Sequence, residues 1–126
     1  MDEKKKILLI DDDEAIINYL VAKLAKIYDL VSTTQPRKAV ALAKTERPDL
    51  ILCDIDMPDF GGGDVAAALA EDAQTAHIPL IYLTSLVSPQ EAEDMDGFVG
   101  GRPGVAKKAT LAELLRRIEE QTSRHY

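Results

Sequence analysis

Five short apolar runs divide the chain, each bounded by charged or turn-forming residues. They cover residues 6–10, 30–33, 50–54, 80–83 and 105–107. Runs of this length with such boundaries are typical of strands that are buried on both faces of a sheet. Between the runs, apolar residues recur at spacings of three and four, which predicts amphipathic helices. The pattern therefore predicts strands that alternate with helices along the chain.

Caps and prolines set the expected boundaries of the first three helices. Asp13 is a candidate N-cap for the first helix. Pro36 stands in the first turn of a second helix, which ends before Pro48. An alanine-rich third helix is predicted over 65–73, after a turn formed by the glycines 61–63.

The last two helices differ in regularity. A fourth helix begins at Ser88, but glycines follow within about two turns, so we expect that helix to be short or irregular. Thr110 and Glu113 form a capping box that opens the final helix. Alternation of this kind predicts an α/β fold: a doubly wound five-stranded parallel sheet with helices on both faces and right-handed crossovers.

Length and charge narrow the possible functions. We expect residues 1–126 to form a single domain with its own core and no output domain after the last helix. The net charge of −7 argues against direct binding of nucleic acid. Cys53 is the only cysteine, which excludes an internal disulfide and fits a reducing compartment. The first apolar run is too short for a signal peptide or a membrane span, so we expect a cytoplasmic protein without membrane insertion.

Polar side chains follow the carboxyl ends of four predicted strands. Asp11 and Asp12 end the first, Asp54 the third, Thr84 the fourth and Lys107 the fifth. Because the carboxyl ends of parallel strands share one edge of the sheet, we expect these side chains to converge. Carboxylates about 4 Å apart repel by roughly 4 kcal/mol at an effective dielectric near 20. Such a cluster should raise its own pKa values or recruit a cation.

The residue types in this cluster indicate phosphoryl chemistry. Oxygen ligands that keep several waters suit Mg²⁺, usually beside a phosphate. A carboxylate such as Asp54 can act as a nucleophile and form an aspartyl phosphate. Thr84 and Lys107 can then hold the phosphoryl oxygens by a hydrogen bond and by charge.

Four motifs, in their order and spacing, carry a resemblance to a known family over nearly the whole chain. They are residues 7–13, residues 48–54 with Met57-Pro58 and Gly61-Gly62, residues 78–85, and Lys107 ahead of residues 113–115. The chain resembles a response-regulator receiver domain of the single-domain, chemotaxis-regulator-like kind. The resemblance implies a flavodoxin-like fold with strand order 2-1-3-4-5.

The resemblance also implies a role for each residue of the cluster. Asp54 would accept a phosphoryl group from a sensor histidine kinase or a histidine phosphotransfer protein. Mg²⁺ would be bound by Asp12 and Asp54, by Asp11 largely through water, and by the backbone carbonyl of Asp56. Thr84 and Lys107 would hold the phosphoryl group and switch the binding of a downstream protein target. The implied activity is that of a self-phosphorylating and self-dephosphorylating signalling domain rather than a dedicated enzyme.

The chain departs from the family pattern at two residues near Lys107. Lys108 stands where the family usually has a proline after a cis peptide bond, and a cis bond before a lysine would cost about 3 kcal/mol. Gly104 replaces the aromatic switch residue. We therefore predict that phosphorylation is intact and that the signal leaves through the first helix or through residues 94–103.

Two other functions fit parts of the sequence. A pseudo-receiver, which would bind partners without ever carrying phosphate, is the main alternative. Asp54 and Asp56 also resemble the nucleophile motif of haloacid-dehalogenase-type phosphatases, but the metal-binding acids of those enzymes come late in the chain, and here Asp11 and Asp12 precede Asp54. The side chain of Asp56 is either a solvent-facing acid or a group that orients water during dephosphorylation.

Overall fold

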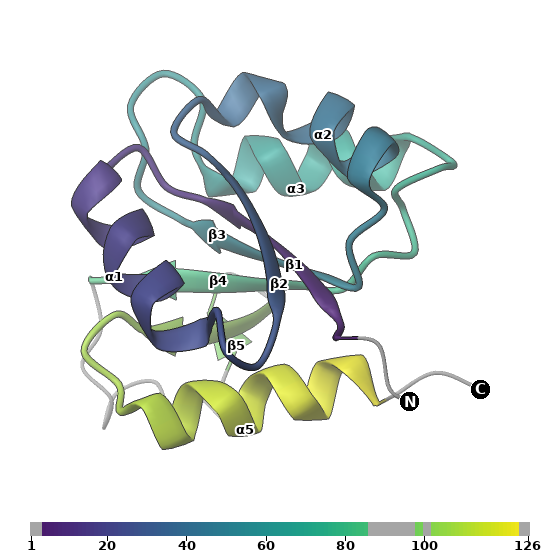
Figure 1. Ribbon diagram of the computed structural model, residues 1–126. Coiled ribbons are helices and arrows are strands. Elements are labelled where there is room, and N and C mark those ends of the chain that lie inside the picture. Colours follow the sequence, from purple (N-terminus) through teal and green to yellow (C-terminus); the bar gives the residue numbers. More distant parts are fainter. Residues whose placement is uncertain (1–3, 86–97, 100–101, 124–126) are drawn as a thin grey trace.

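The computed structural model describes residues 4–85, 98–99 and 102–123, and within these ranges six strands form one sheet (Figure 1). The strands are β1 (Lys6–Ile10), β2 (Asp29–Thr33), β3 (Leu50–Asp54), β4 (Leu80–Thr84), β5 (Phe98–Val99) and β6 (Arg102–Ala106). Their order is β2-β1-β3-β4-β6-β5, and only β5 is antiparallel to its neighbour. The five parallel strands confirm the predicted order 2-1-3-4-5, with β6 as the fifth parallel strand.

Helices cover both faces of this sheet. The described helical elements are α1 (Glu14–Leu24), the 3₁₀ turn η1 (Pro36–Lys38), α2 (Ala39–Glu46), α3 (Gly62–Glu71) and α5 (Leu111–Thr122). In Figure 1, α2 and α3 lie on one side of the strands, and α1 and α5 lie on the other. Two separate apolar cores agree with this arrangement, one containing Ile17 and Ile118 and the other containing Ala43 and Leu69. The predicted fourth helix falls outside the described residues.

Hydrogen bonds at the helix ends explain which helices begin at the predicted residue and which begin elsewhere. Asp13 caps α1, because its Oδ1 accepts the Ala15 N–H at 2.9 Å, as predicted. Helix α3 begins three residues earlier than predicted, since Asp64 Oδ2 accepts the Gly61 N–H at 3.0 Å and caps the helix from within. Pro36 opens a 3₁₀ turn before α2.

The position of Lys107 is set by the end of the last parallel strand. The strand β6 begins three residues before the predicted run and ends at Ala106, so Lys107 follows the strand directly. The Lys107–Lys108 peptide bond is trans.

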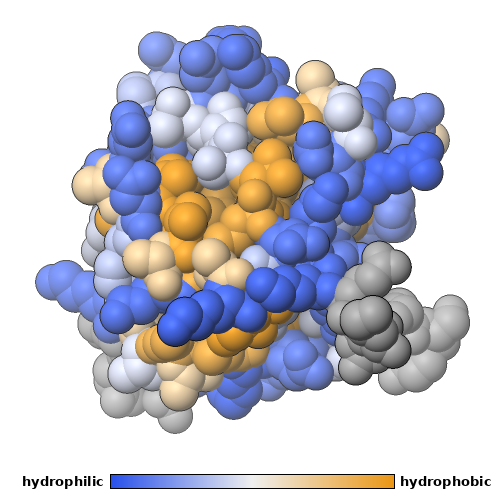
Figure 2. Space-filling model, in the orientation of Figure 1, coloured by the Kyte–Doolittle hydropathy of each residue, from blue (hydrophilic) through white to orange (hydrophobic). Residues whose placement is uncertain are grey.

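Figure 2 shows hydrophobic side chains across the middle of the face that carries the edge strand β2, framed by hydrophilic ones. In the described part of the chain, none of the helices has the length and apolar character needed to cross a membrane.

Candidate functional site

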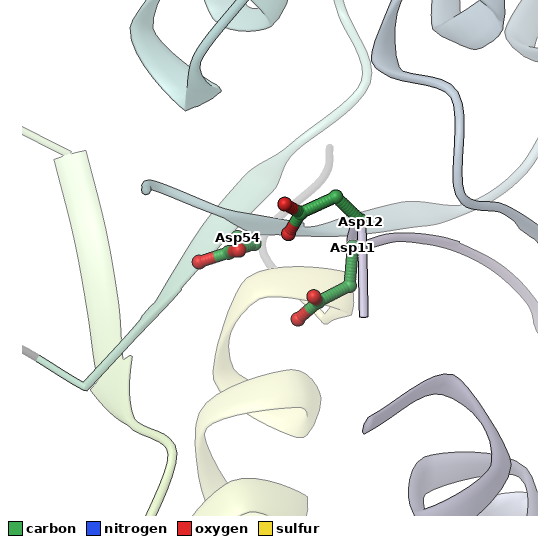
Figure 3. A group of neighbouring side chains, drawn as sticks. All are labelled: Asp11, Asp12 and Asp54. Carbon is green, nitrogen blue, oxygen red and sulfur yellow. The ribbon is translucent and has the colours of Figure 1, made fainter. Parts of the chain in front are cut away.

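Three aspartates converge at the carboxyl edge of the sheet. Asp11 follows β1, Asp12 comes next, and Asp54 is the last residue of β3. Strands β1 and β3 are adjacent and parallel, with Ile10 opposite Cys53, so Asp11 and Asp54 leave the sheet side by side. Figure 3 shows the three side chains beside one another, with the carboxylates of Asp11 and Asp12 extending to the side on which Asp54 lies. The predicted convergence of these side chains is therefore present in the structure.

Lys107 lies between the two buried carboxylates of this group. Its Nζ is 3.2 Å from Asp11 Oδ2 and 3.2 Å from Asp54 Oδ1. The exposed fractions are 1% for Asp11 and 2% for Asp54, whereas Asp12 is exposed. Lys107 thus reaches the cluster through a trans peptide, without the proline that the family usually has at position 108.

Backbone hydrogen bonds fix the orientation of the carboxylates. The Asp13 N–H donates to Asp11 Oδ1 at 2.9 Å, and the Asp56 N–H donates to Asp54 Oδ1 at 3.1 Å. Lys107 is held in the same way, because its backbone N–H donates to the carbonyl of Thr84 at 2.8 Å. Thr84 is the last residue of β4 and is fully buried, and this backbone hydrogen bond places it next to the lysine.

Burial dominates the electrostatics of the site. Loss of solvent raises the pKa of Asp54 to about 6, and the charge of Asp11 adds to the rise, while the Asp56 N–H and Lys107 oppose it. Burial alone would lower the pKa of Lys107, but Asp11 and Asp54 raise it overall. The ammonium therefore stays charged, and the Asp54 carboxylate carries a charge that the folded protein disfavours.

Cys53 and Gly62 lie next to Asp54, the first in the same strand and the second against its backbone carbonyl. Cys53 is fully buried, and burial together with the nearby carboxylates raises the pKa of its thiol to about 12, so the thiol stays protonated. Gly62 packs against the strand so closely that an added Cβ would lie 2.6 Å from the Asp54 carbonyl oxygen. The sequence indicated only a turn at this glycine run, because a contact between loop and strand leaves no local pattern.

The acidic cluster has the donor set of a site for a hard cation. One carboxylate oxygen from each of Asp11, Asp12 and Asp54 lies within 4.8 Å of the others, and this is the one such group that the described ranges contain. Asp11 Oδ2 is buried and accepts no well-directed hydrogen bond, so its compensation is the ion pair with Lys107. Oxygen-only ligands with one exposed member, which leaves room for waters, fit Mg²⁺.

Comparisons with known proteins agree with this geometry. Response regulator PleD of Caulobacter vibrioides is 39% identical over 82 residues, which is 64% of this chain and 18% of PleD. Protein PilH of Pseudomonas aeruginosa is 33% identical over 115 residues, which is 90% of this chain and 93% of PilH. The solved structure of chemotaxis protein CheY4 of Vibrio cholerae has a TM-score of 0.78 at 25% identity and covers 94% of this chain and 98% of that one.

A family model extends the similarity to most of the chain. The model described as the response regulator receiver domain matches residues 7–119. The match includes Asp11, Asp12 and Asp54 as well as Lys107, which contacts two of them. The chain therefore belongs to the response regulator receiver domain family, a class of signalling module in two-component systems rather than a dedicated enzyme.

Proposed function

We propose that Asp54 accepts a phosphoryl group from a phosphohistidine and that the modified domain then changes its binding to a partner protein. One observation carries this proposal: Lys107 Nζ bridges Asp54 and Asp11 at 3.2 Å each, within a buried acidic cluster. This arrangement offers a nucleophile together with a cation that can hold phosphoryl oxygens. Receiver domains act with histidine kinases, and a sensor kinase or a histidine phosphotransfer protein is the donor we propose here.

In the proposed reaction, the atoms of the site have separate tasks. A lone pair of an Asp54 carboxylate oxygen forms the new O–P bond while the N–P bond of the phosphohistidine breaks. The electron pair of that bond stays on the imidazole nitrogen, which then takes a proton from water. Lys107 donates to a phosphoryl oxygen, and the Thr84 hydroxyl donates to another.

We propose that the acidic cluster binds Mg²⁺ during this transfer. The ligands would be the carboxylates of Asp12 and Asp54 and the backbone carbonyl of Asp56, with the Asp11 carboxylate acting largely through water. When bound, Mg²⁺ neutralises the repulsion between the carboxylates and the incoming phosphoryl group. The chain itself contributes rigidity, because the Asp13 and Asp56 N–H groups hold Asp11 and Asp54 in place.

Intact-mass analysis after incubation with acetyl phosphate and Mg²⁺ tests the assignment of Asp54. We expect the wild type to gain one phosphoryl group and Asp54→Asn to gain none. Asp56→Asn is the matched control, because it removes a nearby exposed carboxylate, leaves the Asp54 carboxylate unchanged and should still be modified. A gain of one phosphoryl group by both the wild type and Asp54→Asn would refute the assignment.

The same assay separates the proposed function from the pseudo-receiver alternative. A pseudo-receiver would remain unmodified with acetyl phosphate and would show no response to beryllofluoride with Mg²⁺. The two routes that we predict for the signal, α1 and residues 94–103, can be tested in that experiment by following backbone amide shifts. The cytoplasmic location and the single-domain organisation remain predictions from the sequence.

A further inference from the structure

A cleft opens at the amino-terminal edge of the sheet, at the opposite ends of the strands from Asp54. Its volume is about 620 Å³, within the range of small-molecule sites. Segments from four parts of the chain line it: Lys5 before β1, residues 47–49 before β3, residues 77–79 before β4, and residues 121–122 at the end of α5. None of the residues in the acidic cluster contributes to this cleft.

A smaller hollow of about 320 Å³ adjoins the cleft. The two share a wall made by residues 47–48 and 77–78, and Lys44 and Gln74 line the far side of the smaller hollow. Arg47 and His77, both exposed, therefore stand where the two hollows meet. A ligand in the cleft would meet side chains of both residues.

The cations of this region are incompletely neutralised, although the chain has a net charge of −7. The Asp49 carboxylate, which also lines the cleft, accepts the Lys6 N–H at 2.8 Å. Lys44 is paired with Asp72 at 2.6 Å. Lys5 Nζ donates to the neutral Thr122 hydroxyl at 3.2 Å, and Lys5 forms no ion pair within residues 4–85, 98–99 and 102–123. The guanidinium of Arg47 has no partner among the residues that the structure describes.

The backbone of Arg47 is itself unusual. It ends α2 in the left-handed region with φ 49° and ψ 59°, where glycine is the common residue because a Cβ is disfavoured there. Capping the helix thus does not require an arginine. The side chain that is present offers a fork of N–H donors suited to phosphate oxygens.

The remaining lining residues describe the rest of the ligand. Pro79, which is half-buried, provides apolar surface beside the buried Pro48 and Ile78, and the exposed His77 imidazole adds a flat ring with an N–H donor. The lining comes from four short segments of the chain, which fits a compact molecule better than an extended peptide, since a peptide would lie along a groove. The net charge of −7 opposes a polyanion such as nucleic acid.

We propose that this cleft binds a small molecule of mononucleotide size, with a phosphate group held by Arg47, His77 and Lys5 and a flat organic part against Pro79. The proposal is independent of phosphoryl transfer at Asp54. Occupancy of the cleft would place a ligand against the turns before β3 and β4, which are the strands that carry Asp54 and Thr84.

Titration of the ¹⁵N-labelled protein with ADP, adenosine and pyrophosphate, in the presence of EDTA, tests the proposal. Without divalent cations, phosphates should not gather at the acidic cluster. We expect ADP and pyrophosphate to shift the backbone amides of Arg47 and His77 saturably and to leave those of Asp54 and Lys107 in place. Adenosine, which lacks phosphate, should bind at least about tenfold more weakly than ADP.

Three variants sharpen the test. Arg47→Gly keeps a residue suited to the left-handed cap and removes the guanidinium, so it should fold and bind ADP about tenfold more weakly. Arg47→Lys keeps the charge without the fork and should lie between. Lys26→Gln changes the net charge equally at an exposed position elsewhere and should bind like the wild type. Equal affinity of wild type and Arg47→Gly, or shifts spread over all exposed lysines, would overturn the proposal, whereas modification of Asp54 should be unaffected by all three variants.

Discussion

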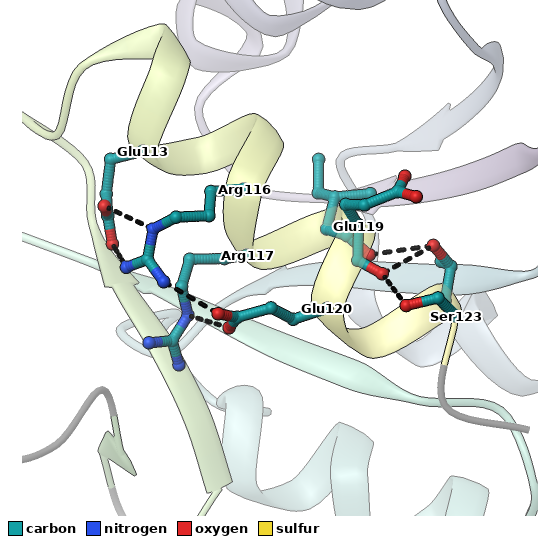
Figure 4. Close-up of polar contacts among 8 residues, drawn as sticks. Glu113, Arg116, Arg117, Glu119, Glu120 and Ser123 are labelled. Atoms are coloured by element: carbon teal, nitrogen blue, oxygen red, sulfur yellow. Dashed lines mark hydrogen bonds and ion pairs between the residues drawn. The ribbon is translucent and has the colours of Figure 1, made fainter.

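The same group, one cation between two carboxylates, occurs twice in the described part of this molecule, with different consequences. At the sheet edge, Lys107 contacts Asp11 and Asp54, at 3.2 Å each. On the outer face of α5, Arg116 contacts Glu113 at 2.6 Å and Glu120 at 2.7 Å (Figure 4). The shorter contacts belong to the exposed group, whose arginine side chain is 55% accessible.

Burial, not distance, decides what each group does. In water, Arg116 and its partners are well solvated before they meet, so their pairing contributes little to stability. At the sheet edge, Asp11 and Asp54 have lost their water, and one lysine serves both of them. Asp54 remains harder to ionise than a free aspartate even with Lys107 beside it. The folded protein therefore keeps two carboxylates out of water at a cost in free energy, and a bound cation or phosphorylation of Asp54 can reduce that cost.

Removal of the buried cation gives the largest expected effect. Lys107→Met should lower the free energy of unfolding by about 2–4 kcal/mol at pH 7.5 in EDTA, because two buried carboxylates lose their partner. Urea denaturation measures this. An unfolding midpoint equal to that of the wild type would show that water compensates the carboxylates and that the site is not effectively buried.

Two consecutive glycines, Gly62 and Gly63, also differ in their surroundings: the first packs against the strand that ends at Asp54, and the second faces open space. An added Cβ at Gly62 would lie 2.6 Å from the Asp54 carbonyl oxygen, whereas one at Gly63 would meet nothing within 4 Å. Gly62→Ala should therefore cost about 2–3 kcal/mol through overpacking against rigid backbone. Gly63→Ala should leave stability unchanged or raise it by about 0.5 kcal/mol, since alanine favours helix. Similar melting temperatures for the two variants would show that β3 and α3 can separate without loss.

Neutralisation of the buried nucleophile should stabilise the metal-free protein. The pKa of Asp54 is raised from 3.8 to about 6, so folding favours the protonated carboxyl. That contribution is fully present below pH 3.8 and is lost as the pH rises through about 6. The side chain of Asp54→Asn cannot ionise. At pH 8 the free energy of unfolding of this variant should therefore exceed that of the wild type by about 1–3 kcal/mol.

Thermal melts of wild type and Asp54→Asn at several pH values measure this difference. In EDTA, the two melting temperatures should approach each other near pH 4, separate as the pH rises toward 6, and differ by a constant amount above it. Mg²⁺ at pH 8 should narrow the gap by stabilising only the wild type. A gap of constant size across the pH range would mean that the asparagine acts through packing instead of charge.

The sequence was informative about the site because the relevant signals are local. An apolar run that stops at a carboxylate identifies both a buried strand and the residue at its end, so the sequence alone places Asp11 and Asp54 at the carboxyl edge of the sheet. Lys107 required more, since its reach depends on the path of the chain after β6. Lys108 stands where the family usually has a proline, and the Thr84 carbonyl accepts the backbone N–H of Lys107 and so fixes the start of the lysine side chain.

Other features depend on contacts between distant segments, which no local pattern encodes. The two-residue strand β5 exists by pairing with β6, and its own sequence is too short to indicate a strand. The contact of Gly62 with the Asp54 carbonyl, and the cleft that joins Lys5, Arg47 and His77, arise only when the strands are assembled. These features depend on the tertiary structure and cannot be predicted from composition or periodicity.

The smallest expected effect belongs to the exposed group on α5. Arg116→Met removes the bridging cation just as Lys107→Met does, and methionine resembles arginine in helix propensity, so the two variants differ mainly in burial. The urea midpoint of Arg116→Met should equal that of the wild type at both 50 and 500 mM salt, about the range over which surface charges become screened. A loss of stability that is present at low salt and vanishes at high salt would show that the α5 ion pairs act as a cooperative network. In that event, the number of linked charges would matter as much as burial, and the contrast between the two groups would be one of degree.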